Sequence, residues 1–244
     1  MEQFPQIRLM GLTGVLIRFA ERLSEPANRA ALAFRSAAEA QNWDGVCETS
    51  TSLASVYLRI DPIAVDPDLV AQKAQSLATS RDWTTEPLPA GRRHWRIPCT
   101  WGGKRAPGLS EVAAMAGASE TEAIAEFSAA SLRVLTLGFA PGQPYLGQLA
   151  PRWEIPRQSQ LTPMVPAGAV LLAVRQFVLF TAPSPTGWRH VGQTAISLFR
   201  PDDPTPVALR PGDEITFHSV PEARMHEILA AGEPDGGAVQ EDLT

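Results

Sequence analysis

The sequence predicts an α+β protein in which an N-terminal ferredoxin-like domain precedes an antiparallel β-barrel. Two observations support this fold class. Within residues 1–88, apolar runs of strand composition alternate with two stretches of helical periodicity that begin at capping residues. From Leu132 onward, short apolar runs are separated by turns rich in glycine and proline, which is typical of a closed or nearly closed antiparallel barrel.

The N-terminal domain is expected to contain two helices. The first begins at Glu25 and runs to about residue 41, because Ser24 can cap its N-terminus and Pro26 suits its first turn. The second opens at Asp66-Pro67, and its apolar residues share one face. The strands expected around these helices span residues 14–19, 46–49, 53–60 and 94–98. This β-α-β-β-α-β order is the split βαβ arrangement of ferredoxin-like domains.

A linker is expected at residues 86–91, where two prolines and a glycine discourage regular strand pairing. The chain therefore divides into a ferredoxin-like domain at residues 1–88, a β-barrel domain at 89–222 and an acidic tail at 223–244. The tail is expected to be disordered, because from Ala231 it combines four acidic residues and three glycines with no apolar period.

The second domain should begin with two helices at residues 109–116 and 119–130. The second of these opens with a Ser119-x-x-Glu122 capping box. The barrel strands are then expected at residues 132–137, 170–174, 178–181, 195–199 and 214–217. Asp213, in a Pro-Gly-Asp turn, is expected to bond local amides rather than a ligand.

Composition argues against several classes of function. The chain has 244 residues and a net charge of −5 with no basic stripe, which argues against a nucleic-acid partner. The N-terminal apolar stretch contains Arg8 and Arg18 and is too short to span a bilayer, so we expect a cytoplasmic protein with no membrane partner. Cys47 and Cys99 lack partners at metal-ligand spacing, so no metal site is predicted and both are expected to be small core residues.

Three turns dense in glycine, proline and aromatic residues suggest a built pocket, because glycine relaxes the backbone and proline fixes it. They span residues 138–147, 165–168 and 184–188. The first reads Gly-Phe-Ala-Pro-Gly-Gln-Pro-Tyr-Leu-Gly, and it resembles the signature Gly-Phe-x-Pro-Gly-Phe-Pro-Tyr-Leu-Gly at every position except Gln143. That signature belongs to the allophanate hydrolase subunit 1 family, also described as the carboxyltransferase C/D domain and as the 5-oxoprolinase B subunit, with KipI-like members.

The resemblance runs from about Leu9 to Val220 and implies that the second domain is a cyclophilin-like barrel. It also suggests a set of substrate-binding residues. Arg157 would suit a carboxylate or phosphate through its planar fork, the alternative being a surface ion pair. Tyr145 would wall the cavity, and the turn ending at Trp188 could present backbone N–H groups to an anion or simply close the barrel. The full set is Pro141, Gly142, Tyr145, Arg157, Gln176, Ser184, Gly187, Trp188, Gln193 and Thr194.

Several positions depart from the family pattern in the same direction, which makes this chain a diverged member. An acidic residue of the family is Gly108 here, and a family His and Tyr are Phe127 and Leu132. A family cation is missing at Leu161-Thr162 and at Gln193. Three explanations stay open: the remaining residues suffice, a partner protein supplies the missing charge, or the chain is a diverged paralogue with another ligand or no catalysis.

The resemblance implies a bacterial component of a heteromeric, ATP-dependent 5-oxoprolinase, a hydrolase that opens a cyclic amide. Its partners would be a protein like allophanate hydrolase subunit 2, the C-type component of 5-oxoprolinase, and a lactam-opening A-type component. ATP would act in the complex, since no phosphate-binding motif is present in this chain. No catalytic residue is assigned. Two alternatives remain open: a carboxyltransferase component of a urea carboxylase or allophanate hydrolase system, and a non-catalytic inhibitor of a sensor histidine kinase.

Overall fold

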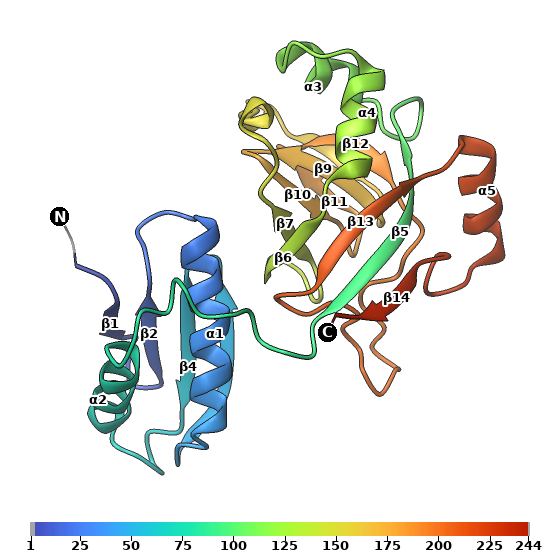
Figure 1. The fold of residues 1–244 in the computed structure, drawn as a ribbon. Coiled ribbons are helices and arrows are strands. Elements are labelled where there is room, and N and C mark those ends of the chain that lie inside the picture. The colour runs from blue at the N-terminus through green and yellow to red at the C-terminus, as the bar shows by residue number, and fades with distance from the viewer. Residues whose placement is uncertain (1–2, 244) are drawn as a thin grey trace. The chain divides into compact units, whose positions relative to one another are not determined.

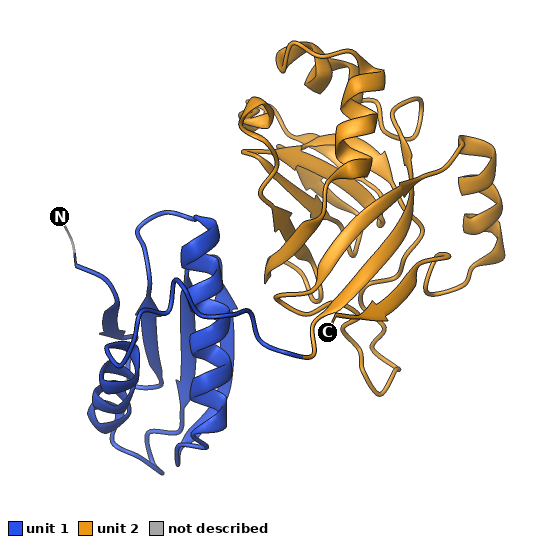
Figure 2. Ribbon diagram, in the orientation of Figure 1, with its two compact units in different colours: residues 1–90 blue, residues 91–244 orange. Residues whose placement is uncertain are grey.

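The computed structural model describes residues 3–243 and divides into two compact units (Figure 2). The N-terminal unit ends at Ala90 and the C-terminal unit begins at Gly91. This division falls within the proline- and glycine-rich stretch where the sequence places its linker. Each unit buries apolar clusters of its own.

The N-terminal unit is a four-stranded antiparallel sheet in the order β1-β2-β4-β3, with two helices on one face (Figure 1). Helix α1 packs on β3 and β4, and α2 packs on β1 and β2. Both helices begin at the predicted caps: Ser24 accepts from the Ala27 N–H at 3.3 Å, and Asp66 accepts from the Asp68 N–H at 2.9 Å. The elements are β1 (Gln6–Leu9), β2 (Gly14–Arg18), α1 (Glu25–Ala40), β3 (Val46–Ser52), β4 (Ser55–Ile60) and α2 (Pro67–Ala78).

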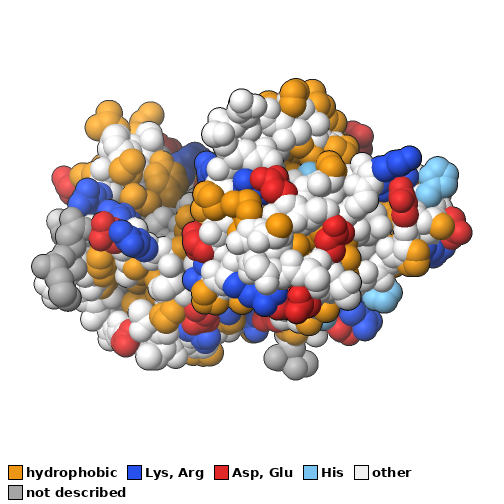
Figure 3. All heavy atoms as spheres, turned by 90° about the horizontal axis from the view of Figure 1, so that it is seen from above, with side chains coloured by type: hydrophobic (Ala, Val, Ile, Leu, Met, Phe, Trp, Pro, Cys, Tyr) orange, Lys and Arg blue, Asp and Glu red, His pale blue; other side chains and the backbone are white. Residues whose placement is uncertain are grey.

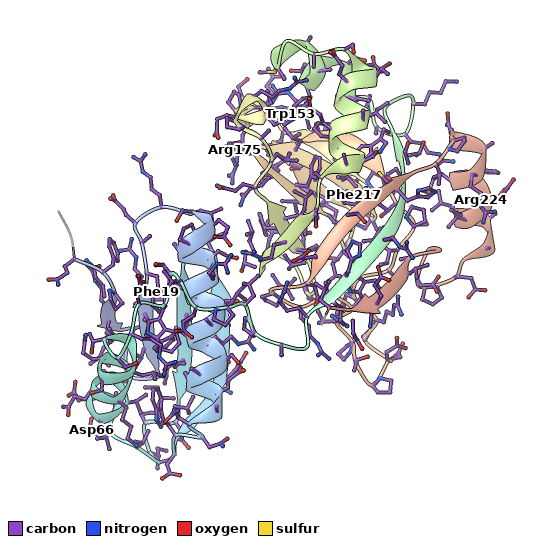
Figure 4. All side chains as sticks on the ribbon, viewed as in Figure 1. Phe19, Asp66, Trp153, Arg175, Phe217 and Arg224 are labelled. Atoms are coloured by element: carbon purple, nitrogen blue, oxygen red, sulfur yellow. The ribbon has the colours of Figure 1, made fainter. Side chains whose placement is uncertain are left out.

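The core of this unit lies between the sheet and the helices. Phe34 of α1 is fully buried there, and its ring meets those of Phe19 and Trp83 at centroid distances of 5.4 and 5.3 Å. Figure 4 shows Phe19 at the end of β2 and Asp66 at the start of α2. Cys47, expected in the core, is exposed, whereas Cys99 of the C-terminal unit is buried as predicted.

The β-α-β-β-α-β order is wrong in its last strand. The strand expected at residues 94–98 is β5 (Arg93–Trp101), which belongs to the C-terminal unit and pairs there with β13 (Glu214–Ser219), β12 (Arg189–Gln193) and β14 (Val239–Asp242). The N-terminal sheet instead takes its fourth strand from β1, which forms a hairpin with β2. Residues 97–101 of β5 are all buried, as a central strand requires, and local composition does not reveal which sheet supplies the partners.

The C-terminal unit contains a closed barrel whose seven strands run in the order β6-β13-β5-β12-β9-β10-β7, with β7 pairing back to β6. All neighbours are antiparallel except β5 and β13, which are parallel, so the expectation of a purely antiparallel barrel is wrong at this pair. The long stretch of chain between these two strands supplies the crossover that a parallel pair needs. The remaining strands of the unit are β6 (Leu132–Leu137), β7 (Pro144–Gly147), β8 (Thr162–Val165), β9 (Ala169–Ala173), β10 (Gln176–Leu179) and β11 (Ser184–Thr186).

No strand forms at residues 195–199, another difference from the sequence prediction. Ile196 and Leu198 are buried there, but pairing is limited to an isolated bridge between Phe199 and Val207. The Ser197 N–H donates instead to the Pro234 carbonyl at 2.8 Å. An apolar run therefore indicated burial correctly without indicating a ladder of hydrogen bonds.

Helices α3 (Leu109–Met115) and α4 (Glu120–Ala129) lie at one end of the barrel, with the predicted Ser119–Glu122 capping box in place (Figure 1). Hydrogen bonds from Ser119 lower the pKa of the Glu122 carboxyl. Phe127 of α4 packs against Trp153 at a centroid distance of 4.5 Å, in an aromatic core that also contains Phe217 (Figure 4). The helix thereby seals this end of the barrel.

The expectation of a disordered tail is also wrong. Helix α5 (Glu222–Ala231) buries Met225 and Ile228 against the unit, and Gly232 ends it in the left-handed conformation with φ of 68°. Strand β14 then pairs antiparallel with β5. Glu241 contacts His94 of β5 at 3.1 Å, so part of the acidic composition reflects pairing with a basic strand rather than solvation of a free tail.

Candidate functional site

The C-terminal unit contains a cavity of about 430 Å³, within the range of about 300–1,000 Å³ that is usual for small-molecule sites. The two longer predicted turns, at residues 138–147 and 184–188, meet here with β10 and with the segment around Arg157. The lining residues are Phe139, Gln143, Tyr145, Arg157, Gln158, Leu161, Val178, Phe180, Pro185, Thr186, Gly187 and Trp188.

Arg157 supplies the positive charge of the cavity wall. Its guanidinium lies over the Trp188 ring, 5.4 Å from the centroid, and the residue is exposed. It forms no ion pair with any of the described residues, so the surface ion pair considered as the alternative is not formed with them. Its position is set locally, because the Gln158 N–H donates to the Gly187 carbonyl at 2.7 Å and joins the two loops.

Tyr145 and Trp188 form an aromatic corner. Their rings meet edge to face at 6.0 Å, and Trp188 is buried among apolar residues of β9 and β10. The backbone N–H of Trp188 donates to the Thr186 hydroxyl at 3.0 Å. This bond fixes the turn that carries the indole. The Tyr145 hydroxyl forms no hydrogen bond with the residues that the structure describes and is available to a ligand.

Gln143 brings a neutral polar group into the same wall. The residue is only 1% exposed and lines the cavity. Its side-chain amide forms no hydrogen bond with any residue in the described range. The cavity therefore combines an aromatic corner, one cation and one buried amide.

The structure brings together only part of the predicted site. Tyr145, Arg157, Gly187 and Trp188 line the cavity, and Ser184 lies one residue from Pro185 in β11. The lining does not include Pro141, Gly142, Gln176, Gln193 or Thr194. Conversely, the sequence did not predict the lining residues Phe139, Gln143, Gln158, Leu161, Val178, Phe180, Pro185 and Thr186.

Two of the residues outside the lining hold a turn in place. The Gln193 amide donates to the carbonyls of Ala167 and Thr194, both at 2.8 Å, and the Thr194 hydroxyl donates to the Gly168 carbonyl at 2.9 Å. Their donor groups thus bond carbonyls in and beside the turn at residues 165–168. For Gln143 a signal was present in the sequence, because it is the one polar substitution within an otherwise matched motif.

Other reactive side chains lie away from the cavity. Burial lowers the pKa of His190 and raises that of Cys99, so the imidazole stays neutral and the thiol protonated near pH 7. Among residues 3–243, no three His, Cys, Asp or Glu side chains gather closely enough to hold a metal ion. Nor does any helix in that range have the length and apolarity to cross a membrane. Basic and acidic side chains are interspersed on the face shown in Figure 3.

A family model for the carboxyltransferase domain, subdomain C and D, matches residues 5–209 of the chain. The chain therefore belongs to this family. It is 32% identical over 228 residues to the 5-oxoprolinase B subunit of Bacillus subtilis (strain 168), covering 91% of this chain and 95% of that protein. It is also 38% identical over 133 residues to the 5-oxoprolinase B subunit of Escherichia coli O157:H7, covering 54% of this chain and 61% of that protein.

The chain is also similar to solved structures. The crystal structure of TTHA0988 matches 88% of this chain with a TM-score of 0.71 and 30% identity, and the match spans 40% of that longer chain. The Kluyveromyces lactis urea carboxylase matches 97% of this chain with a TM-score of 0.76, over 24% of its own length. At 16% identity, this second similarity shows the fold alone.

Proposed function

We propose that this chain is the B-type component of a heteromeric, ATP-dependent 5-oxoprolinase and that its cavity binds 5-oxoproline or the phosphorylated lactam. The observation that carries the proposal is the 32% identity to a 5-oxoprolinase B subunit over nearly the whole length of both chains. The cavity adds chemical support, because its residues suit a small ring that bears a carboxylate.

Each part of 5-oxoproline has a counterpart in the cavity wall. The planar guanidinium of Arg157 can take both oxygens of the substrate carboxylate, and no acidic residue in the described range competes for it. The edge-to-face rings of Tyr145 and Trp188 offer an apolar surface to the methylene groups of the lactam ring. These residues bind and orient the substrate, while ATP bound in the complex supplies a phosphoryl group to the lactam oxygen.

The apolar rim of the cavity favours the binding of a partner protein. Phe139 and Leu161 line the cavity yet are 76% and 66% exposed. Large apolar side chains at a cavity mouth favour contact with another protein surface. We propose that the C-type component of the complex covers this rim, shields the substrate from water and completes the site, with a separate A-type component acting on the activated lactam.

The test is ATP hydrolysis stimulated by 5-oxoproline, measured for this chain co-expressed with its cognate C-type partner and for each protein alone. Stimulation is expected only in the pair. The variant Arg157→Ala should reduce kcat/KM for 5-oxoproline by about 10- to 100-fold, the effect of losing a charge-assisted hydrogen bond. Arg224→Ala is the matched control, because Arg224 is an exposed arginine of α5 that pairs with Glu227 and lies outside the cavity (Figure 4).

The outcomes separate the three functions that the sequence leaves open. Stimulation that survives Arg157→Ala unchanged would remove Arg157 from the site while leaving the chain's place in the complex intact. A pair that forms but shows no stimulation, and instead transfers carboxyl from a biotin carrier, would favour the carboxyltransferase alternative. No complex and no stimulation would favour a non-catalytic binding protein.

A further inference from the structure

Gln143 is a buried polar residue in the wall of the cavity. The residue is 1% exposed and lines the cavity, and its side-chain amide forms no hydrogen bond with another residue in the described range, although its polar atoms are not among those fully cut off from the accessible surface. Buried polar side chains are nearly always hydrogen-bonded, since an unpaired amide in an apolar surrounding loses its bonds to water without replacement. A cavity-wall amide whose groups are not used by the protein is available to bond a ligand group.

The backbone around Gln143 holds the side chain in place. The Gly138 N–H donates to the Gln143 carbonyl at 3.0 Å, and the Gln143 N–H donates to the Ala140 carbonyl at 3.1 Å. Gly142 before it has a φ of 70°, and Pro144 after it has its φ fixed by the ring. Both main-chain groups of Gln143 are thus used inside the turn, so the side-chain amide is its remaining hydrogen-bonding group.

The chemistry of an amide defines what it can recognise. The side-chain carbonyl of Gln accepts a hydrogen bond and its NH₂ group donates, so it can read a second amide, which has the same two functions. The apolar side chains of Val178 and Phe180 in the same wall cannot make such bonds. A carboxylate bound at Arg157 does not need Gln143. Gln143 is then available to bond the lactam group of the substrate.

We propose that Gln143 determines specificity by accepting a hydrogen bond from the lactam N–H, so that the cavity selects a cyclic amide over a ring of the same shape without the N–H. This inference rests on the proposed function, because it assumes that the cavity holds 5-oxoproline. The bond leaves the lactam oxygen free for phosphoryl transfer. It also lets the nitrogen release more electron density towards that oxygen, which favours attack on phosphorus.

The test compares two ligands in the intact pair of proteins. One is 5-oxoproline and the other is its lactone analogue, 5-oxotetrahydrofuran-2-carboxylate, which keeps the carboxylate, the ring and the carbonyl but replaces N–H by oxygen. Binding is measured by calorimetry without ATP. We expect the wild-type pair to bind the lactam about tenfold more tightly than the lactone, the effect of one hydrogen bond in a buried site.

Gln143→Met keeps the length of the side chain and removes its hydrogen-bonding groups. We expect this variant to bind the lactam about tenfold more weakly and to bind lactam and lactone nearly equally. Gln160→Met is the matched control, because Gln160 is exposed, lies outside this cavity and should keep the wild-type preference.

A thermal melt of the ligand-free chain distinguishes recognition from a structural role. If Gln143 serves only a ligand, Gln143→Met removes an unpaired buried amide and the Tm should stay the same or rise. A clear fall in Tm together with an unchanged preference for the lactam would assign Gln143 to the fold and overturn the inference.

The remaining outcomes separate the inference from the proposed function. If the wild-type pair binds 5-oxoproline and Gln143→Met retains the tenfold preference over the lactone, the inference fails and the proposed function stands. If the wild-type pair binds neither ligand and its ATP hydrolysis does not respond to 5-oxoproline, both fail together.

Discussion

The polar side chains of the turn at Asp213 and of the cavity wall at Gln143 and Arg157 differ in their hydrogen bonding. The Asp213 carboxylate accepts from the N–H groups of Arg93 and Arg210, at 3.1 and 2.9 Å, and forms an ion pair with the Arg93 side chain. Gln143 and Arg157 find no such partners among the described residues. The Asp213 carboxylate is thus satisfied inside the chain, whereas the polar groups of Gln143 and Arg157 remain available for binding.

Substitution of Asp213 is expected to have the largest effect of those that test this comparison. The Asp213 side chain is 2% exposed and that of Arg93 is 14% exposed. Removing the carboxylate leaves the Arg93 guanidinium with bonds to Ala208 and Gln240 but without this ion pair, and it leaves two backbone N–H groups without their acceptor. We expect Asp213→Ala to lower the free energy of unfolding by about 3 kcal/mol. Urea denaturation of the full chain measures it. The isosteric Asp213→Asn, which keeps one acceptor oxygen, should cost less.

A stability loss below about 1 kcal/mol for Asp213→Ala would remove the basis for calling this cluster structural. The contrast with the cavity would also fail if Asp213→Asn, folded and stable, abolished the response of ATP hydrolysis to 5-oxoproline. The Pro-Gly-Asp turn would then have to be reassigned to the site.

Gly142 tests the loop that carries Gln143 and Tyr145. A Cβ at Gly142 would lie 2.9 Å from the Leu198 carbonyl oxygen, and its φ of 70° disfavours any β-branched residue. We expect Gly142→Val to cost about 2–3 kcal/mol of stability, the scale of a strained backbone conformation with a clash added. The measurement is again urea denaturation.

Gly138, at the other end of the same loop, provides the matched control. A Cβ there meets no atom within 4 Å, so Gly138→Val should change stability by less than about 0.5 kcal/mol. Equal losses in the two variants would show that the loop is sensitive to any substitution and would remove the specific role assigned to Gly142.

Whether an interaction is local or distant along the chain explains what could be predicted from the sequence. The caps at Ser24, Asp66 and Ser119 are confirmed because each involves a bond only two or three residues away. The sequence predicts strand β5 but places it in the wrong unit, because its partners β13 and β14 lie more than a hundred residues further along the chain. Periodicity reports burial and does not report which strand pairs with which.

The candidate site divides in the same way. The glycine- and proline-rich turns predict Tyr145 and Trp188 as site residues, and both line the cavity. Gln193 is also among the predicted site residues, yet its amide donates to the carbonyls of Ala167 and Thr194. The position of a residue in the sequence does not show whether its side chain is hydrogen-bonded to a nearby carbonyl. This hydrogen bonding decides whether the residue has a structural role or is available to a ligand.

Tyr145 gives the smallest expected effect and the finest test of the comparison. Tyr145→Phe keeps the ring that packs on Trp188 at 6.0 Å and removes only the hydroxyl, which has no partner within the described residues. We expect stability to be unchanged and the kcat/KM of the stimulated pair to fall by about two- to tenfold, the effect of one neutral hydrogen bond to substrate.

Tyr57→Phe is the matched control, because Tyr57 is the other tyrosine of the chain and its hydroxyl donates to the Thr13 carbonyl in the N-terminal unit, at 3.4 Å. It should leave kcat/KM unchanged. If Tyr145→Phe also turns over normally, the Tyr145 ring is a wall of the cavity and no more. If Arg157→Ala is normal as well, the cavity is not the substrate site, and unsatisfied polar groups on this barrel do not identify binding.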